Sequence, residues 1–289
     1  MSKIFLDSGN PEETKEAVNL LRMGRPNVEL TGQTTNPSLI AKNLPPHLDA
    51  RCGGVVGKKM VEIELLSLYK KIVTEISNLI PSGSVSIEVY SDEKTSIEEM
   101  ISQGKMMNSW ISNAHIKLPI TANGLAAAEK LVGEGVRVNM TLCFSQEQAA
   151  AVHAATRGAK KGDVFISPFI GRLDDRGENG MDLIKNIFEM YKTNNSHVEL
   201  LTASVRNVYH LIQAMEIGSD IVTCPIKIIK EWNGIKPFDS AQGKLENNLR
   251  SIEYKKIDLN QSWQSFDIHH ELTDIGLAKF AFDWKSVLI

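Results

Sequence analysis

One lysine in this chain stands where lysine is rarely found. Lys117 lies within the short apolar segment 115–118, which predicts a buried strand. A buried ammonium group is unfavourable unless it is paired or its pKa has fallen. A lysine that has lost its proton is a nucleophile for carbonyl carbon, and the product is a Schiff base. Taken alone, Lys117 is better explained as a strand-end lysine that reaches solvent or pairs with a carboxylate, so the rest of the chain must decide.

Polar side chains stand at the ends of seven consecutive segments predicted as strands. A turn or a helix cap explains a single Ser, Thr or Asn at such a place, and an ion pair explains a single Asp or Glu. Seven strand ends that all carry such groups around one lysine favour an active site. In chain order these groups are Asp7, Thr34, Thr35, Asn36, Glu88, Lys117, Asn139, Thr141, Ser167, Arg172, Ser204 and Arg206.

Four of these residues could perform proton and carbonyl chemistry. Lys117 must be neutral to attack a ketone, so we expect its pKa to fall from ~10.4 towards ~7–8. Burial would favour the neutral amine, and positive charge at longer range would act in the same direction. Asp7 and Glu88 could move protons, directly or through a water molecule that Thr141 holds.

Two arginines complete the set. Arg172 and Arg206 offer several N–H donors in a fixed planar geometry, which suits a phosphate group. We therefore expect a sugar phosphate whose phosphate lies at the sixth and seventh strands and whose carbonyl lies at Lys117.

The periodicity of the sequence predicts the elements that would position these groups. Eight short apolar segments alternate with segments of helical periodicity, which is typical of parallel strands covered on both faces. Eight such units in 289 residues predict an α/β protein with a single (β/α)8 (TIM) barrel over residues 1–289. The strands are expected at 3–7, 28–31, 85–89, 115–118, 137–144, 164–169, 198–202 and 221–225. The clearest helices are expected at 11–23, 60–79, 123–133, 146–155, 181–191 and 207–217.

Two segments fall outside these regular units. Two prolines and three glycines predict a long loop at 44–59. The polar, weakly periodic residues 233–270 predict an insertion, and helical periodicity returns in an additional C-terminal helix over 271–289, clearest at 272–284.

Composition argues against several classes of protein. A net charge of −3 does not favour binding to nucleic acid or to a membrane surface, and no apolar segment approaches the ~18 residues of a membrane span. Cys52, Cys143 and Cys224 are odd in number and far apart. We expect a reduced, cytoplasmic protein with neither a disulfide framework nor a zinc site.

The strand-end segments resemble those of the transaldolase family. The resemblance extends from about Phe5 to Ile226, and the segments together are specific although each alone is only suggestive. They are LDSGN, TTNPSLIAK, SIEV, IKLPITANGLAAAEKL, NMTLCFSQEQA, ISPFIGRLDD and ASVRN. The C-terminal sequence LTDIGLAKFAFDW is similar to the tail of the small oligomeric transaldolases and fructose-6-phosphate aldolases. In that subfamily the last helix packs on a neighbouring subunit, which implies a homo-oligomer.

The resemblance also implies a role for each catalytic residue. Lys117 would form the Schiff base with C2 of a ketose phosphate, and Asp7 would be the acid and base at the hydroxyl where the carbon–carbon bond breaks. Glu88 and Thr141 would hold the water that relays protons. The imine is itself the electron sink, so the resemblance implies no metal and no other cofactor.

For the substrate, the resemblance implies contacts along its whole length. Asn36, Asn139 and Ser167 would bind the hydroxyls of the retained dihydroxyacetone unit, and the two arginines would bind phosphate. The residues expected to contact the substrate are Thr34, Asn36, Asn139, Ser167, Phe169, Arg172, Ser204 and Arg206.

Two positions separate the two activities of the family. Aldolase members generally carry Gln at the position of Glu88 and Tyr at the position of Phe169. The phenyl ring of Phe169 cannot donate a hydrogen bond to the catalytic water, which favours a long-lived enamine that awaits an acceptor.

The expected activity is therefore that of a transaldolase of the non-oxidative pentose phosphate pathway. Its donor would be sedoheptulose 7-phosphate or fructose 6-phosphate, and its acceptor an aldose phosphate. A fructose-6-phosphate aldolase is the alternative. A non-catalytic scaffold is disfavoured because Lys117 and Asp7 are both present.

Overall fold

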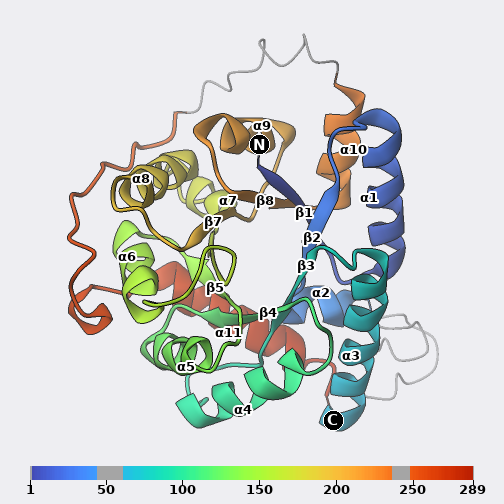
Figure 1. Ribbon diagram of the computed structural model, residues 1–289, viewed down its shortest axis with the longest axis horizontal. Helices are drawn as coiled ribbons and strands as arrows, with labels where there is room; N and C mark the ends of the chain where they lie inside the picture. Colours follow the sequence, from blue (N-terminus) through green and yellow to red (C-terminus); the bar gives the residue numbers. More distant parts are fainter. Residues whose placement is uncertain (1, 44–60, 236–247, 289) are drawn as a thin grey trace.

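Eight parallel strands close into one barrel in this computed structural model, which describes residues 2–43, 61–235 and 248–288 (Figure 1). Each strand pairs with its neighbours in chain order, and β8 pairs with β1 to close the ring. The predicted (β/α)8 architecture is confirmed. The strands are β1 (Lys3–Asp7), β2 (Leu30–Thr34), β3 (Ser84–Glu88), β4 (Ala114–Pro119), β5 (Val138–Cys143), β6 (Val164–Pro168), β7 (Glu199–Thr202) and β8 (Ile221–Cys224).

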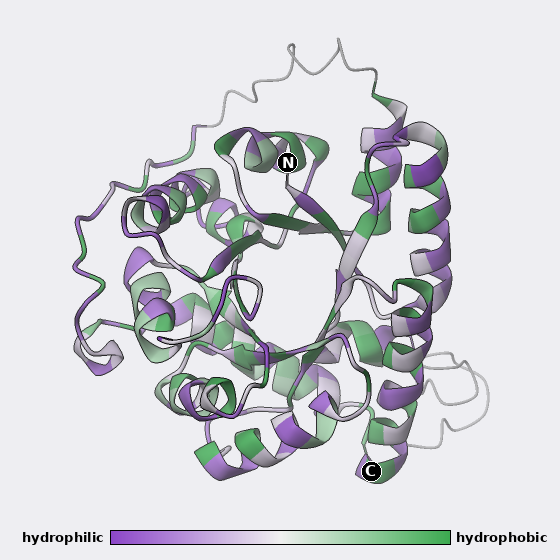
Figure 2. Ribbon diagram, in the orientation of Figure 1, coloured by the Kyte–Doolittle hydropathy of each residue, from purple (hydrophilic) through white to green (hydrophobic). Residues whose placement is uncertain are grey.

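Helices surround the barrel, and hydrophobic and hydrophilic bands alternate along them (Figure 2). Two begin at asparagine caps followed by proline: Asn10 accepts a hydrogen bond from the backbone of Glu12 at 3.0 Å, and Asn36 from that of Leu39 at 2.9 Å. The helices are α1 (Pro11–Gly24), α2 (Pro37–Lys42), α3 (Glu62–Leu79), α4 (Ile97–Asn108), α5 (Ala122–Gly133), α6 (Gln146–Ala155), α7 (Ile170–Asp174), α8 (Gly180–Thr193), α9 (Val208–Ile217), α10 (Ile226–Gly234) and α11 (Glu271–Lys285), with a 3-10 turn, η2, at Trp263–Ser265.

The structure differs from the sequence prediction mainly at the second strand. Seven strands agree within one residue at each end, but β2 is Leu30–Thr34 rather than 28–31. The polar Gln33 does not indicate a strand, yet it is buried there, because it donates to the carbonyl of Ser8 at 2.7 Å and accepts from Thr14 at 2.7 Å. The helical periodicity also failed to single out α4, α7 and α10. The loop predicted at 44–59 lies outside the described residues.

The N-terminal end of the barrel is filled by side chains from opposite strands. The ring of Phe165 lies 6.0 Å from that of Phe5 and stacks at 3.9 Å on that of His115. The imidazole of His115 is hydrogen-bonded to Ser84 and to the carbonyl of Gly162, and burial lowers its pKa to about 3, so it is neutral. This packed layer leaves only the other end of the barrel available for a site.

The described segment 248–270 runs along the outside of the barrel before α11 begins (Figure 1). In this segment Arg250 exchanges backbone hydrogen bonds with Gly177 and Asn179, each at 2.8 Å. Further along, Arg157 of the α6–β6 segment donates to the carbonyl of Leu259 at 2.7 Å. The insertion predicted at 233–270 stays a prediction: α10 extends to Gly234, and residues 236–247 lie outside the described part of the chain.

Helix α11 lies across the C-terminal end of its own barrel. Its Thr273 donates to the carbonyl of Leu142 in β5 at 2.9 Å, and its Asp283 accepts a hydrogen bond from Ser38 of α2. Its buried side carries Leu272, Leu277, Phe280 and Trp284. The predicted C-terminal helix is confirmed, and its packing on a neighbouring subunit stays a prediction.

The cysteines and the helix lengths bear on two further expectations from the sequence. The thiols of Cys143 and Cys224 are buried and free, and Cys52 lies outside the described residues. Among the helices that the structure describes, none has the length and apolar character of a membrane span.

We predict that Gly32→Ala destabilises the barrel by about 1–3 kcal/mol, because overpacking forces side chains out of favourable rotamers. A Cβ atom at Gly32 would lie 2.3 Å from the ring of Phe5. Urea unfolding followed by circular dichroism measures the effect. Gly133→Ala, at the end of α5 with no atom within 4 Å of the new methyl group, is the matched control and should leave stability unchanged or raised. Equal behaviour of the two variants would contradict the packing argument.

Candidate active site

The register of the parallel strands places Lys117 between two polar neighbours. Lys117 of β4 lies level with Glu88 of β3 on one side and with Asn139 of β5 on the other. Its Nζ is 3.0 Å from Oε2 of Glu88 and donates to the carbonyl of Thr35 at 3.3 Å. The side chains of Lys117 and Glu88 are each 3% exposed. The lysine therefore does not reach bulk solvent, and its charge is compensated inside the barrel.

Glu88 is held by groups on β4 and α3. Burial raises the pKa of its carboxyl, and the charge of Lys117 opposes this rise. Its backbone N–H donates at 3.0 Å to the hydroxyl of Tyr69, which comes from α3. That hydroxyl donates in turn to Thr35, at 2.6 Å, because the proton of Thr35 goes to the carbonyl of Ser86. The sequence did not single out Tyr69, whose hydroxyl links the backbone of Glu88 to the side chain of Thr35.

One hydroxyl in this buried layer has no partner. Oγ1 of Thr141 is fully buried and makes no hydrogen bond within the part of the chain that the structure describes. By contrast, the side chain of Asn139 is engaged on both sides: it accepts from Ser167 at 2.7 Å and donates to Ser86 at 3.0 Å. Buried polar groups are rarely left unpaired, so Thr141 stands out as a group that a ligand would satisfy.

Asp7 forms the wall on the side of β1. Thr34 donates to its Oδ1 at 2.7 Å, and the hydroxyl of Thr223 in β8 lies 2.7 Å from that of Thr34. Burial raises the pKa of Asp7, while the charge of Lys117 and the Thr34 hydrogen bond counteract the rise. Thr223 is a site residue that the sequence reasoning missed, although a lone polar residue between Val222 and Cys224 is a signal that could have found it.

These groups border a cavity of about 540 Å³ at the C-terminal ends of the strands. Four of the residues predicted from the sequence do not line it. Thr35, Glu88 and Thr141 lie in the buried layer with Lys117, and Asn139 supports Ser167. Residues of α2 and α11 also line it, which the sequence did not predict; they include Ser38, Leu39, Lys42, Leu272, Ile275, Lys279 and Phe280. The predicted residues on its wall are Asp7, Thr34, Asn36, Lys117, Ser167, Phe169, Arg172, Ser204 and Arg206.

Two arginines stand at the end of this cavity near β6 and β7. Arg206 forms an ion pair with Asp175 at 2.8 Å and is half exposed. The guanidinium of Arg172 lies 5.3 Å from the ring centre of Phe169 and 5.6 Å from that of Phe280. Burial and the charge of Arg206 lower the pKa of Arg172. This end of the cavity is positively charged and suits a phosphate.

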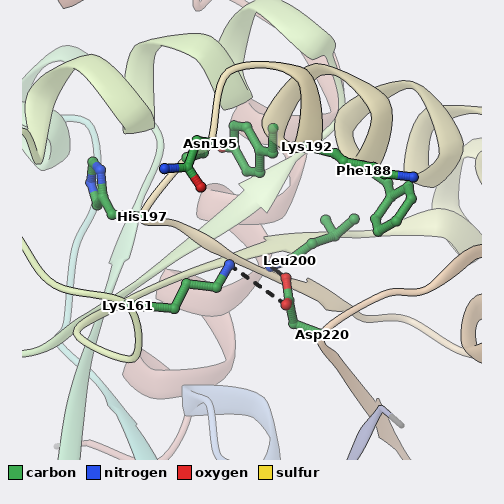
Figure 3. A pocket seen from close by; sticks show the side chains of 9 residues that line it. Lys161, Phe188, Lys192, Asn195, His197, Leu200 and Asp220 are labelled. Carbon is green, nitrogen blue, oxygen red and sulfur yellow. Dashed lines mark hydrogen bonds and ion pairs between the residues drawn. The ribbon is translucent and has the colours of Figure 1, made fainter.

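A second hollow, also of about 540 Å³, lies among the segments that precede β7 and β8 (Figure 3). Its lysine, Lys161, is 3.5 Å from Asp220 and donates to the carbonyl of Val198 at 3.2 Å. His197 lies on its rim and is hydrogen-bonded to Thr156. Because Lys161, Asp220 and His197 already have partners, and because barrel active sites lie at the other end, we assign this hollow no chemistry.

Comparisons with known proteins identify the family of this chain. A family model described as transaldolase/fructose-6-phosphate aldolase matches residues 4–289. A probable transaldolase of Dehalococcoides mccartyi is 35% identical, over 99% of each chain. Probable transaldolases of Brucella ovis and Clostridioides difficile are 39% and 32% identical, each over 98% of this chain and 97% of the relative. A solved structure described as a putative dehydratase from Mesorhizobium loti has a TM-score of 0.47 and 10% sequence identity to this chain. The alignment covers 78% of this chain and 55% of that protein, and a similarity this low supports no argument.

We predict that Asp7→Asn makes the protein more stable, by a margin that grows with pH. An unfolded aspartate titrates near ~3.9. Since burial raises the pKa of Asp7 in the folded state, the wild type loses stability as the pH rises from that value through the folded pKa. The asparagine does not titrate. Urea unfolding from pH 3 to pH 8 measures the difference, with Glu93→Gln, at an exposed carboxylate, as the control. A margin that shrinks with rising pH would contradict the raised pKa.

Proposed function

Because this chain belongs to the transaldolase/fructose-6-phosphate aldolase family, we propose that it is a transaldolase that works through a Schiff base on Lys117. The observation that carries the proposal is the buried pair of Lys117 and Glu88 at the floor of a cavity with positive charge at one end. The unit transferred is dihydroxyacetone, from fructose 6-phosphate or sedoheptulose 7-phosphate to an aldose phosphate.

Formation of the Schiff base requires Lys117 to lose a proton and the ketone oxygen to leave as water. Glu88 lies 3.0 Å from the amine and can accept its proton. A raised pKa makes Glu88 a better base, because it binds that proton more readily. The amine then adds to C2 of the ketose, and protonation of the resulting hydroxyl expels water. The unpartnered hydroxyl of Thr141 fits the second contact of a water that relays these protons.

Cleavage of the carbon–carbon bond requires a base on the other side of the cavity. Asp7 takes the proton of the C4 hydroxyl, the C3–C4 electron pair flows into the iminium group, and an aldose phosphate leaves. Lys117 then carries a neutral enamine, and Asp7 carries the proton. In the second half-reaction the enamine attacks the acceptor aldehyde and becomes an iminium again, and Asp7 returns its proton to the new hydroxyl. Water then hydrolyses the iminium, which releases the ketose product and regenerates the amine of Lys117. The raised pKa of Asp7 suits a carboxyl group that must act both as a base, when deprotonated, and as an acid, when protonated.

The rest of the cavity would bind the substrate along its length. Arg172 and Arg206 hold the phosphate, which places the carbonyl at Lys117. Asn36 and Ser167 contact hydroxyls of the dihydroxyacetone unit. Asn139 acts through Ser167, whose hydroxyl it orients.

Transfer rather than release depends on how long the enamine survives. Phe169 lies 6.0 Å from Nζ of Lys117 and presents a ring that cannot donate a hydrogen bond to a nearby water. Protonation of the enamine by such a water would release free dihydroxyacetone. The phenyl ring disfavours that step, which is why transfer is preferred over aldolase activity.

Four further properties follow from the same proposal. The substrates place the enzyme in the non-oxidative pentose phosphate pathway, and we expect it in the cytoplasm. We also expect a homo-oligomer, in which the C-terminal helix α11 contacts a neighbouring subunit. We expect no metal or other cofactor, because the imine is itself the electron sink.

The experiment that tests the proposal follows glyceraldehyde 3-phosphate release from fructose 6-phosphate through a coupled NADH assay. We predict sustained turnover with erythrose 4-phosphate and at most a single turnover without it, because the enamine needs an acceptor. Equal turnover in both cases, with free dihydroxyacetone, would make the protein an aldolase. No turnover in either case would favour a scaffold or another donor.

A double substitution tests the basis of this preference. We predict that Glu88→Gln with Phe169→Tyr shifts the enzyme from transfer towards release of dihydroxyacetone, because the tyrosine hydroxyl can order the water that protonates the enamine. The measurement is the ratio of free dihydroxyacetone to transferred product. Each single substitution serves as a control, and an unchanged ratio in the double variant would place specificity in other residues.

A further inference from the structure

We propose that Gly276 and Phe280 of the C-terminal helix α11 are positioning residues for Arg172, so that α11 determines the preference for phosphorylated substrates. The inference rests on the proposed function, in which Arg172 binds the substrate phosphate. Gly276 and Phe280 both lie more than one hundred residues after Arg172 in the sequence.

The first observation is that two aromatic rings flank the guanidinium of Arg172. Phe169, at the end of β6, lies 5.3 Å away, and Phe280 of α11 lies 5.6 Å away. Both rings are buried. A guanidinium group is attracted to the faces of such rings, and its N–H groups at the edge stay available to a ligand.

The second observation is the close approach of α11 to the same arginine. A Cβ atom at Gly276 would lie 2.6 Å from Nη1 of Arg172 and 2.6 Å from a methyl group of Leu142. Glycine is unfavourable in the interior of a helix. Its presence here is explained by the space that the arginine and the end of β5 occupy.

Arg172 also differs from its neighbour Arg206 in what holds it. Arg206 is paired with Asp175 at 2.8 Å. For Arg172, the described residues provide no carboxylate within ion-pair distance. Its orientation therefore depends on packing, and much of that packing comes from α11.

The helix is fixed well enough to perform this role. Thr273 donates to the carbonyl of Leu142 and accepts from Gln148 of α6, each at 2.9 Å. Leu142 has a left-handed backbone with φ of 60° at an irregularity in β5, next to Thr141. Near the other end of α11, Asp283 accepts from Ser38 of α2. The helix is thus tied to β5, α6 and α2.

The test compares two phenylalanines on opposite sides of the same helix. Phe280→Leu removes the ring over Arg172, and Phe282→Leu removes a ring that is 71% exposed and does not line the cavity. The readout is kcat/KM for fructose 6-phosphate divided by kcat/KM for fructose, with erythrose 4-phosphate as acceptor. We expect Phe280→Leu to lower this ratio about tenfold, mostly through KM for the phosphorylated donor. Phe282→Leu should leave the ratio unchanged.

Gly276→Ala and Arg172→Ala complete the design. Gly276→Ala should lower the same ratio. Inorganic phosphate should become a weaker competitive inhibitor of Phe280→Leu and of Gly276→Ala, and this second readout does not depend on activity with fructose. Adding Phe280→Leu to Arg172→Ala should cause no further loss of the ratio, because the ring acts through the arginine. If Phe280→Leu fails to fold, Gly276→Ala and phosphate inhibition carry the test.

The outcomes separate the inference from the proposed function. If Arg172→Ala lowers the ratio but Phe280→Leu and Gly276→Ala do not, α11 does not position the arginine, and the proposed function stands. If Arg172→Ala leaves the ratio unchanged, Arg172 does not bind the substrate phosphate and the inference fails, whereas the transaldolase activity itself is judged by the acceptor-dependent turnover described above.

Discussion

The active end of this barrel depends on the buried ion pair between Lys117 and Glu88. Two charges at 3% exposure are tolerated only because they lie 3.0 Å apart and because the carbonyl of Thr35 accepts a second hydrogen bond from the amine. The parallel register of β3 and β4 places the two residues level. Removing one partner would leave the other buried without compensation, so the pair constrains both strands. The same closeness allows a proton to pass from the amine to the carboxylate.

A second constraint is the closure of the barrel by a helix from the end of the chain. The segment 248–270 follows the outer helices and delivers α11 to the mouth of the cavity, where it contributes Leu272, Ile275 and Phe280 to the lining. The floor of the cavity comes from the strands and its roof from α11. The proposed chemistry at Lys117 and the proposed phosphate recognition near Arg172 thus depend on parts of the chain that are distant in sequence.

The sequence predicted the floor of the site better than its roof. Asp7, Glu88 and Lys117 stand at strand ends, and the strands of a parallel barrel all end at one face, so their convergence follows from the strand positions alone. The contribution of Phe280 could not be predicted, because it depends on where an irregular segment delivers α11. Tyr69 was missed because a tyrosine on an amphipathic helix is usually a packing residue. The hydrogen bonds of Asn139 to Ser86 and Ser167 could not be predicted either, because they depend on how β3, β5 and β6 align with one another, which the local sequence of a strand does not specify.

The central claim is that Lys117 is the nucleophile, and the most direct measurement is to trap its imine. The enzyme would be incubated with fructose 6-phosphate and sodium borohydride, digested, and mapped by mass spectrometry, beside Lys117→Met. The account predicts a reduced substrate adduct on the peptide that contains Lys117, and no adduct in the variant. An adduct on another lysine, or dihydroxyacetone transfer by the variant, would contradict it.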